Sequence, residues 1–133
     1  MDKRSLAWGA ALMALAVALG AFGAHGLKAK VDADALAQWN TGVQYHFLHA
    51  LGLLLLANLG AQLPPKAISR IRMFFLSGIL FFCLSLYLLS TRAILGTQFL
   101  TPILGPITPL GGLFFIVGWM ILLITTLLNK DQG

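Results

Sequence analysis

A short polar stretch, residues 44–49, holds most of the side chains that could do chemistry. It lies at the mouth of a long apolar run over residues 50–63 and contains Gln44, Tyr45, His46 and His49. The third histidine of the chain, His25, ends the first apolar run. Neutral imidazole is a good metal ligand, and residues spaced i and i+3 lie on one face of a helix. His46 and His49 could therefore share one metal ion, with His25 closing the site from another helix.

Haem binding is a second possibility for the same histidines. Haem needs only one or two axial ligands, and His25 with His46 or His49 would supply them. The competing interpretation is structural: each histidine donates one N–H to a backbone carbonyl at a Gly- or Pro-rich turn and packs between helices. Polar residues inside a membrane are costly and often functional. Because these residues are expected near an interface, we favour the structural role.

Other chemistry has little support in the sequence. A proton-coupled transporter usually needs a carboxylate inside the membrane, whereas the chain has no Glu and its four Asp residues all lie outside the apolar runs. Ser77 and Ser85 have no carboxylate partner for nucleophilic catalysis. The Gly105–Gly112 stretch lacks the lysine of a phosphate-binding loop. We therefore predict that the protein is not an enzyme.

The composition indicates which solvent surrounds the folded chain. Of its 133 residues, 59% are hydrophobic and only 10% are charged, and the mean hydropathy is +0.88. Soluble domains typically carry about 25% charged residues. The sequence therefore predicts an integral membrane protein in contact with the lipid bilayer. The net charge of +5 then comes from Lys and Arg in loops, and no nucleic-acid partner is expected.

Four apolar runs are long enough to cross a hydrocarbon core about 30 Å thick. The predicted spans are residues 6–24, 43–63, 73–91 and 110–128, within one membrane domain that covers residues 1–133. Pro64 and Pro65 end the second span, because proline disfavours the helix before it. The sequence therefore predicts an all-α protein, a four-transmembrane-helix bundle. A cleaved signal peptide is the competing interpretation of the first run, but its stripes of small residues favour a packed helix.

The segment between the third and fourth spans, Arg92–Pro109, has an unusual composition. It holds one charge and three prolines among many apolar residues. Because prolines interrupt helices and exposed loops are ordinarily polar, we expect a Pro/Gly-rich segment folded back over the bundle. Irregular backbone at that depth needs cover from the protein. A loop that lies flat at the interface is the alternative.

Basic residues flank the spans unevenly. Six lie on the side of the two termini, namely Lys3, Arg4, Lys66, Arg70, Arg72 and Lys130. Three lie on the other side, namely Lys28, Lys30 and Arg92. The positive-inside rule therefore predicts that both termini are cytoplasmic. At the outer end we expect one polar cluster, formed with residues 101–112 and comprising His25, Gln44, Tyr45, His46, His49 and Tyr87.

Four stretches of the chain resemble a known family. They are Gly20–Leu27, Tyr45–Leu51, Phe82–Tyr87, and Gly105–Gly112 together with Gly118-Trp119. In this order they resemble the small four-span family of unknown function that includes the YgdD-like bacterial inner-membrane proteins and a human transmembrane relative. The third stretch departs from that pattern at Leu84, where a small residue is expected. The resemblance covers nearly the whole chain and implies a four-helix protein of the bacterial inner (plasma) membrane, with no catalytic residue to carry over.

Two functional hypotheses follow. The first is a non-enzymatic membrane protein with an interaction or assembly role, whose partner would be a second copy of the chain or another membrane protein. The second is a small haem- or metal-binding membrane module that uses the outer histidines.

Overall fold

The computed structural model describes residues 1–129, which are helical almost throughout and contain no strand. Four rods are long and apolar enough to span a membrane, which confirms the predicted fold class. The first rod is α1 (Lys3–Phe22), extended by a π-helical turn (Gly23–Leu27). The second is α2 (Ala33–Asn58), extended by a 3₁₀ turn (Leu59–Ala61).

The third rod has three parts, which are α3 (Pro65–Gly78), a π-helical turn (Ile79–Cys83) and α4 (Leu84–Ser90). A short helix α5 (Arg92–Leu95) and a 3₁₀ turn (Gln98–Leu100) connect it to the fourth rod, α6 (Thr101–Asn129). The polar tail, with the Lys130 that the topology prediction counted, lies outside the described residues.

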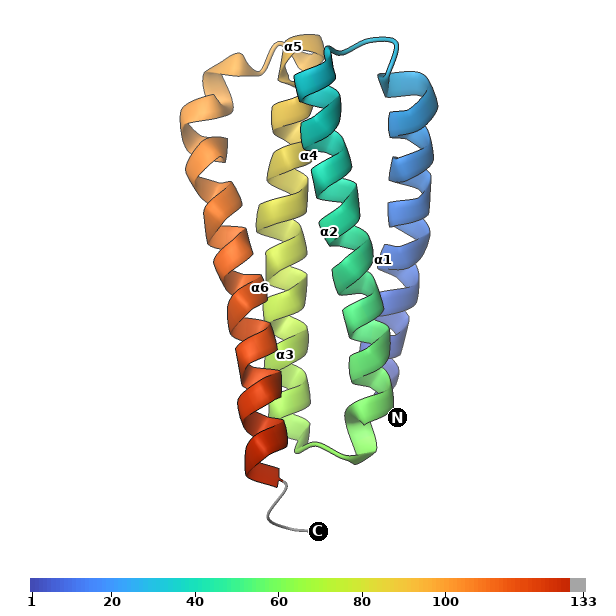
Figure 1. The fold of residues 1–133 in the computed structure, drawn as a ribbon, viewed down its shortest axis with the longest axis vertical. Helices are drawn as coiled ribbons and strands as arrows, with labels where there is room; N and C mark the ends of the chain where they lie inside the picture. The colour runs from blue at the N-terminus through green and yellow to red at the C-terminus, as the bar shows by residue number, and fades with distance from the viewer. Residues whose placement is uncertain (130–133) are drawn as a thin grey trace.

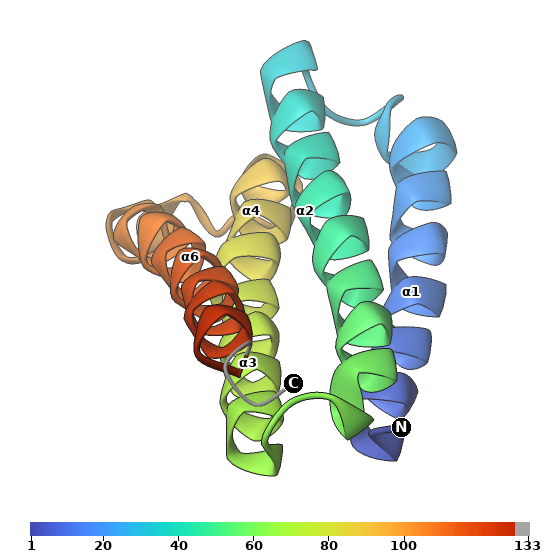
Figure 2. The same ribbon diagram turned by 60° about the horizontal axis from the view of Figure 1, so that its bottom comes forward.

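Helices that follow one another in the chain also lie side by side (Figure 1). α1 packs on α2, α2 packs on the third rod, and the third rod packs on α6. α1 and α6 therefore stand on opposite flanks, with α2 and the third rod between them (Figure 2). The start of α1 and the last turn of α6 lie at one end of the molecule, which we call the terminal end; α5 lies at the other, the α5 end (Figure 1).

The two inner rods carry the core. In the most apolar stretch of each rod, 50% of the residues of the second rod and 44% of those of the third rod are buried within the protein. The corresponding share is 17% in each of the two flanking rods. The fully buried side chains of this core include Leu53, Leu56, Ile71 and Phe75. The flanking rods therefore present most of their apolar surface outward, as expected for helices in contact with lipid.

The ends of the helices follow local sequence signals. The Asp2 carboxylate caps α1 by accepting from the Ser5 N–H at 3.1 Å. The Asp32 carboxylate caps α2 in the same way, accepting from the Ala35 N–H at 2.8 Å. Pro65 occupies the first turn of α3, where its missing N–H would have no helical partner. The turn between the second and third rods is therefore set by the two prolines, as predicted.

Two glycines let the rods approach closely. A Cβ at residue 111 of α6 would overlap the backbone of Phe81 and Phe82 in the third rod. On the other side of that rod, a Cβ at residue 42 of α2 would lie 2.9 Å from the Tyr87 ring. Small residues of this kind allow close helix contacts where no hydrophobic effect drives association. The second contact places Tyr87 directly against α2.

The predicted folded-back segment over Arg92–Pro109 is not found. Residues 101–109 are the first turns of α6, and Pro106 and Pro109 lie inside that helix. Each of these prolines removes one backbone hydrogen bond, a loss that membrane helices tolerate because side chains and neighbouring helices satisfy the freed groups. In the same turns the Thr108 hydroxyl bonds to the Leu104 carbonyl at 3.2 Å and contacts the Ser85 hydroxyl of the third rod at 2.6 Å. The expectation was wrong because proline interrupts helices less in an apolar solvent than in water.

Candidate functional site

His49 connects α2 to α6. Its side chain is buried, with Nδ1 2.8 Å from the Tyr45 carbonyl oxygen and Nε2 3.0 Å from Nε1 of Trp119. The imidazole also stacks on the Phe115 ring, with centroids 3.5 Å apart and planes 11° from parallel. Because an indole nitrogen can only donate, Nε2 accepts and Nδ1 carries the proton. Both ring nitrogens are engaged, so the contacts of His49 match the structural interpretation.

His46 lies one turn earlier on α2 but faces the third rod. It is 1% exposed, and its Nδ1 lies 2.9 Å from the Tyr87 hydroxyl oxygen of α4. Within residues 1–129, its Nε2 has no hydrogen-bond partner. The Leu12 backbone of α1 lies near the ring, without the geometry of a hydrogen bond to Nε2. A buried polar atom without a partner is uncommon and asks for an explanation.

The Tyr87 hydroxyl decides which nitrogen of His46 carries the proton. Its bond to His46 is the one side-chain hydrogen bond that the hydroxyl makes among the described residues. If Nδ1 carried the proton, the buried hydroxyl proton would have no acceptor, which is costly. The hydroxyl therefore donates to Nδ1, and the imidazole proton is on Nε2. His46 thus presents a buried N–H donor that lacks an acceptor.

His46 and Tyr87 lie at the base of an apolar groove of 590 Å³ between α1 and the third rod. One wall comes from α1 and includes Leu12, Leu15 and Leu19; the other comes from the third rod and includes Ile79, Leu80 and Cys83. We call this the lateral groove. α1 and the third rod stand on either side of α2 (Figure 2), and Trp39 and His46 of α2 line the groove between them.

Both α2 histidines lie near the middle of the α2 rod. α2 begins at Ala33 rather than near residue 43. His46 is thirteen residues from that start, so at helical rise it lies about 20 Å along the rod, near its middle. The expected span began at residue 43, and the structure adds residues 33–42 to the same helix, so His46 lies well away from both ends of the rod.

The predicted cluster is divided among separate places. His25 is exposed on the π-helical turn after α1, because Gly23 and Leu27 of that turn face the protein instead. Gln44 is exposed as well. Among the described residues, no group of three His, Cys, Asp or Glu side chains could hold a metal ion. The structure thus does not bring the three predicted ligands together.

One part of the expected cluster does form against α6. Tyr45 and His49 line a pocket of 500 Å³ together with Pro109, Gly112 and Trp119. Tyr45 is 38% exposed, and its ring packs on Phe82 with centroids 4.6 Å apart. The 44–49 stretch therefore meets α6 through Phe115 and Trp119, one to two turns beyond residues 101–112, while Pro109 and Gly112 of that range line the same pocket.

A second polar group occupies the terminal end. Asp2 forms an ion pair with Arg72, whose Nη1 also lies 3.3 Å from the Ser5 hydroxyl oxygen. Burial alone would raise the pKa of the Asp2 carboxyl, but hydrogen bonds from Ser5 and the charge of Arg72 bring the pKa below its usual value. Asp2 is therefore a carboxylate at neutral pH and joins α1 to α3.

Sequence reasoning missed two residues of these sites. From the sequence, Trp119 is singled out only in the Gly118-Trp119 pair of the family resemblance, although its indole N–H is the partner of His49. Arg72 was counted as loop charge, although its side chain is only 13% exposed. The available signals for these contacts were a tryptophan deep in a span and a lone acidic residue at the start of the chain, because each of these side chains needs a partner when it is buried.

Comparisons with known proteins agree with this architecture. Residues 19–112 match the family model described as "Protein of unknown function (DUF423)". The UPF0382 membrane protein YwdK of Bacillus subtilis is 45% identical over 83% of this chain and 85% of its own length. A UPF0382 membrane protein of Haemophilus influenzae is 38% identical over 78% of this chain and 77% of its own length. No solved structure matches the chain.

Proposed function

Because this chain belongs to the DUF423 family of proteins of unknown function, with relatives that are bacterial membrane proteins, we propose that it is a non-enzymatic membrane protein with an interaction role. The interaction is the binding of a lipid-soluble molecule in the lateral groove. That molecule is uncharged and carries a carbonyl oxygen, which accepts a hydrogen bond from Nε2 of His46.

The buried Nε2–H of His46 carries this proposal. His46 lines a groove formed mainly by apolar side chains, and its Nε2–H has no hydrogen-bond partner among the described residues. A ligand oxygen at this point would satisfy a donor that otherwise stays unpaired, which is the usual way in which one polar group orients a ligand in an apolar pocket. The Tyr87 hydroxyl would hold the imidazole in the tautomer that donates to the ligand.

The depth of His46 limits the class of ligand. Near the middle of a membrane-spanning helix, a charged group would be costly. Phospholipid ester groups lie at the interface, roughly half a hydrocarbon thickness from the bilayer centre. An uncharged carbonyl compound that dissolves in the hydrocarbon, such as a quinone with an alkyl chain, can reach this depth.

The side chains that line the groove suit binding better than catalysis. Its polar and sulfur-bearing groups are the indoles of Trp8 and Trp39, the hydroxyl of Tyr87, His46 and Cys83. It contains no carboxylate or lysine, and among the described residues the Cys83 thiol makes no hydrogen bond to His46, whose Nδ1 is engaged by Tyr87. A nucleophile with its own base is therefore missing from this set.

We also propose that the protein lies in the bacterial inner membrane with both termini cytoplasmic. Lys3, Arg4, Lys66, Arg70 and Arg72 all belong to segments at the terminal end, and Lys28, Lys30 and Arg92 to segments at the α5 end. This excess of basic residues supports a cytoplasmic terminal end.

A decyl-substituted benzoquinone provides the probe, because quinones quench tryptophan fluorescence and Trp8 and Trp39 line the groove. Purified protein in mild detergent should show saturable quenching. His46→Leu should weaken binding, whereas His25→Leu, which changes an exposed histidine, should not. Equal weakening by both variants, or quenching that never saturates, would refute the proposal.

Two further variants separate the groove from the rest of the lipid-facing surface. Leu80→Phe enlarges a side chain that lines the groove and is 55% exposed. Leu123→Phe makes the same change on α6, where the side chain is 51% exposed. Only Leu80→Phe should block the probe. A disulfide-linked dimer from cysteines placed at Leu15 and Leu80 would instead identify a second copy of the chain as the occupant of the groove.

The same purified protein tests the haem- or metal-binding alternative. We expect an absorption spectrum without a Soret band and less than stoichiometric metal. Both ring nitrogens of His49 are engaged, and the three histidines do not form a group that could hold a metal ion among the described residues. A Soret band that persists in His25→Leu but is lost in His46→Leu would identify haem, rather than a carbonyl compound, as the ligand of the lateral groove.

A further inference from the structure

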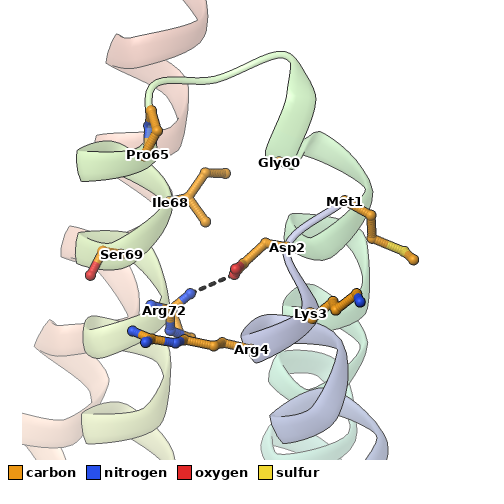
Figure 3. A pocket seen from close by; sticks show the side chains of 9 residues that line it. All are labelled: Met1, Asp2, Lys3, Arg4, Gly60, Pro65, Ile68, Ser69 and Arg72. Carbon is orange, nitrogen blue, oxygen red and sulfur yellow. Dashed lines mark hydrogen bonds and ion pairs between the residues drawn. The ribbon is translucent and has the colours of Figure 1, made fainter.

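A second pocket, independent of the lateral groove, lies at the terminal end. It has a volume of 520 Å³ and is formed by the first residues of the chain, the 3₁₀ turn after α2 and the start of α3 (Figure 3). Three basic side chains line it, from Lys3, Arg4 and Arg72, against the single carboxylate of Asp2. The pocket therefore has an excess of positive charge.

The two arginines reach the pocket from opposite walls. Arg72 extends from α3 to the Asp2 carboxylate, and Arg4 extends from α1 toward the same space (Figure 3). Both hydrogen bonds of Arg72 to Asp2 and Ser5 use Nη1. A guanidinium has five N–H donors, so most of those on Arg72 are left for another acceptor. A guanidinium group binds phosphate through two parallel hydrogen bonds, and two such groups face this one space.

The backbone adds to the same potential. α1 begins at Lys3 and α3 begins at Pro65, and both of these ends border the pocket. The N-terminus of a helix carries partial positive charge and unpaired N–H groups. At α1 the Asp2 carboxylate already accepts from the Ser5 N–H, whereas the first turn of α3 has no side-chain cap and its Ala67 and Ile68 N–H groups bond to the Pro64 carbonyl. The charge of the side chains and that of the helix ends therefore have the same sign.

The position of the pocket identifies the kind of anion. It lies where two membrane-spanning rods begin and a third ends, which is the level of the lipid headgroups. Pro65, Gly60 and the buried side chain of Ile68 also line the pocket and make one side of it apolar. Basic pockets between helices at this level are suited to phosphate headgroups whose acyl chains stay in the membrane. A zwitterionic headgroup would bring its ammonium group beside the arginines, so a net anionic lipid is favoured.

We propose that this pocket binds the phosphate of an anionic phospholipid headgroup through Arg4 and Arg72. Asp2 remains ion-paired to Arg72 and orients its guanidinium, and Arg4 supplies the charge that Asp2 does not neutralise. The lipid would thereby tie the start of α1 to α3 at the terminal end, where the flanking rod α1 otherwise packs mainly on α2.

The test uses the whole protein in mild detergent, with native mass spectrometry to count bound lipid. Phosphatidylglycerol is compared with phosphatidylcholine of the same acyl chains, and inorganic phosphate and glycerol phosphate are added as competitors. Phosphatidylglycerol should be retained preferentially, and Arg4→Gln should lower its retention roughly fivefold, the effect of one basic contact near the membrane surface. Arg4 is exposed, so the variant should fold.

Arg70→Gln is the matched control, because it removes the same charge from an exposed position of α3 that does not line the pocket. It should leave retention of phosphatidylglycerol unchanged. An equal loss in Arg70→Gln would reduce the effect to general charge and overturn the proposal. Equal retention of phosphatidylglycerol and phosphatidylcholine would also overturn the proposal. Displacement of the lipid by inorganic phosphate at low concentration would assign the pocket to free phosphate.

Discussion

The Tyr87 hydroxyl oxygen lies 2.9 Å from Nδ1 of His46, joining α4 to α2 across the buried middle of the protein. The two residues are 41 positions apart in the chain. Gly42 makes the contact possible, because a side chain there would displace the Tyr87 ring. Through this hydrogen bond, Tyr87, which lies outside the polar 44–49 stretch, sets the tautomer of His46, which lies within it.

Tyr87→Phe should remove this hydrogen bond while keeping the ring. An interhelical hydrogen bond in a membrane is worth about 0.6 kcal/mol on average, so unfolding in detergent should become easier by about that amount. Binding of the quinone probe should weaken too, because the Nε2 proton of His46 is no longer fixed in place. Tyr45→Phe is the control, since that side chain is 38% exposed and should change neither property. An unchanged probe affinity in Tyr87→Phe would contradict the tautomer argument.

His49→Ala should destabilise the protein more than one hydrogen bond would. The variant loses the bonds to Trp119 and Tyr45 and leaves a cavity beside Phe115. Together these effects should lower the free energy of unfolding by about 2 kcal/mol. Thermal unfolding in detergent measures the change, and His25→Ala, at an exposed position, should leave it unaltered. A loss below about 0.5 kcal/mol would mean that α6 does not depend on this contact.

The sequence predicted the four spans well but not the pairing of their faces. Length and composition alone mark an apolar run as a span, so the spans could be predicted without knowing their neighbours. Which residue of α2 meets Tyr87 or Trp119 depends on how three helices pack, and that information is not local. The prolines of α6 misled for a related reason, because helix propensity measured in water does not describe a helix in lipid.

Gly111→Ala should disrupt the contact between α6 and the third rod. Its new methyl group would overlap the backbone of Phe81 and Phe82, which cannot rotate away as a side chain can. Overpacking of this kind costs about 1–3 kcal/mol. At the next residue, Gly112→Ala adds the same methyl group 3.7 Å from the Phe82 ring, an ordinary contact. Any gain in helix propensity is common to both variants, so a difference in their thermal unfolding isolates the overlap.

The Asp2 ion pair should make stability depend on pH at the acid end. The pKa of Asp2 is lowered in the folded protein, so its stabilising effect is fully present above the ordinary pKa near 3.8 and is lost as the pH falls below that value. Unfolding measured in detergent from pH 7 to pH 3 should therefore show an acid-induced loss in the wild type. Asp2→Asn should be less stable at pH 7 and should lack that part of the loss. Asp34→Asn, at an exposed position, should behave as the wild type does.

The proposed orientation makes a prediction for intact cells. Cysteine in place of Lys30, in the exposed connection between the first two rods, should react with a membrane-impermeant maleimide. Cysteine in place of Lys66, at the exposed start of α3, should react only after the membrane is permeabilised. The native Cys83 is fully buried and should not contribute to the signal. The reverse labelling pattern would place the terminal end outside, and with it the basic pocket, because Arg4 and Arg72 belong to the same end as Lys66.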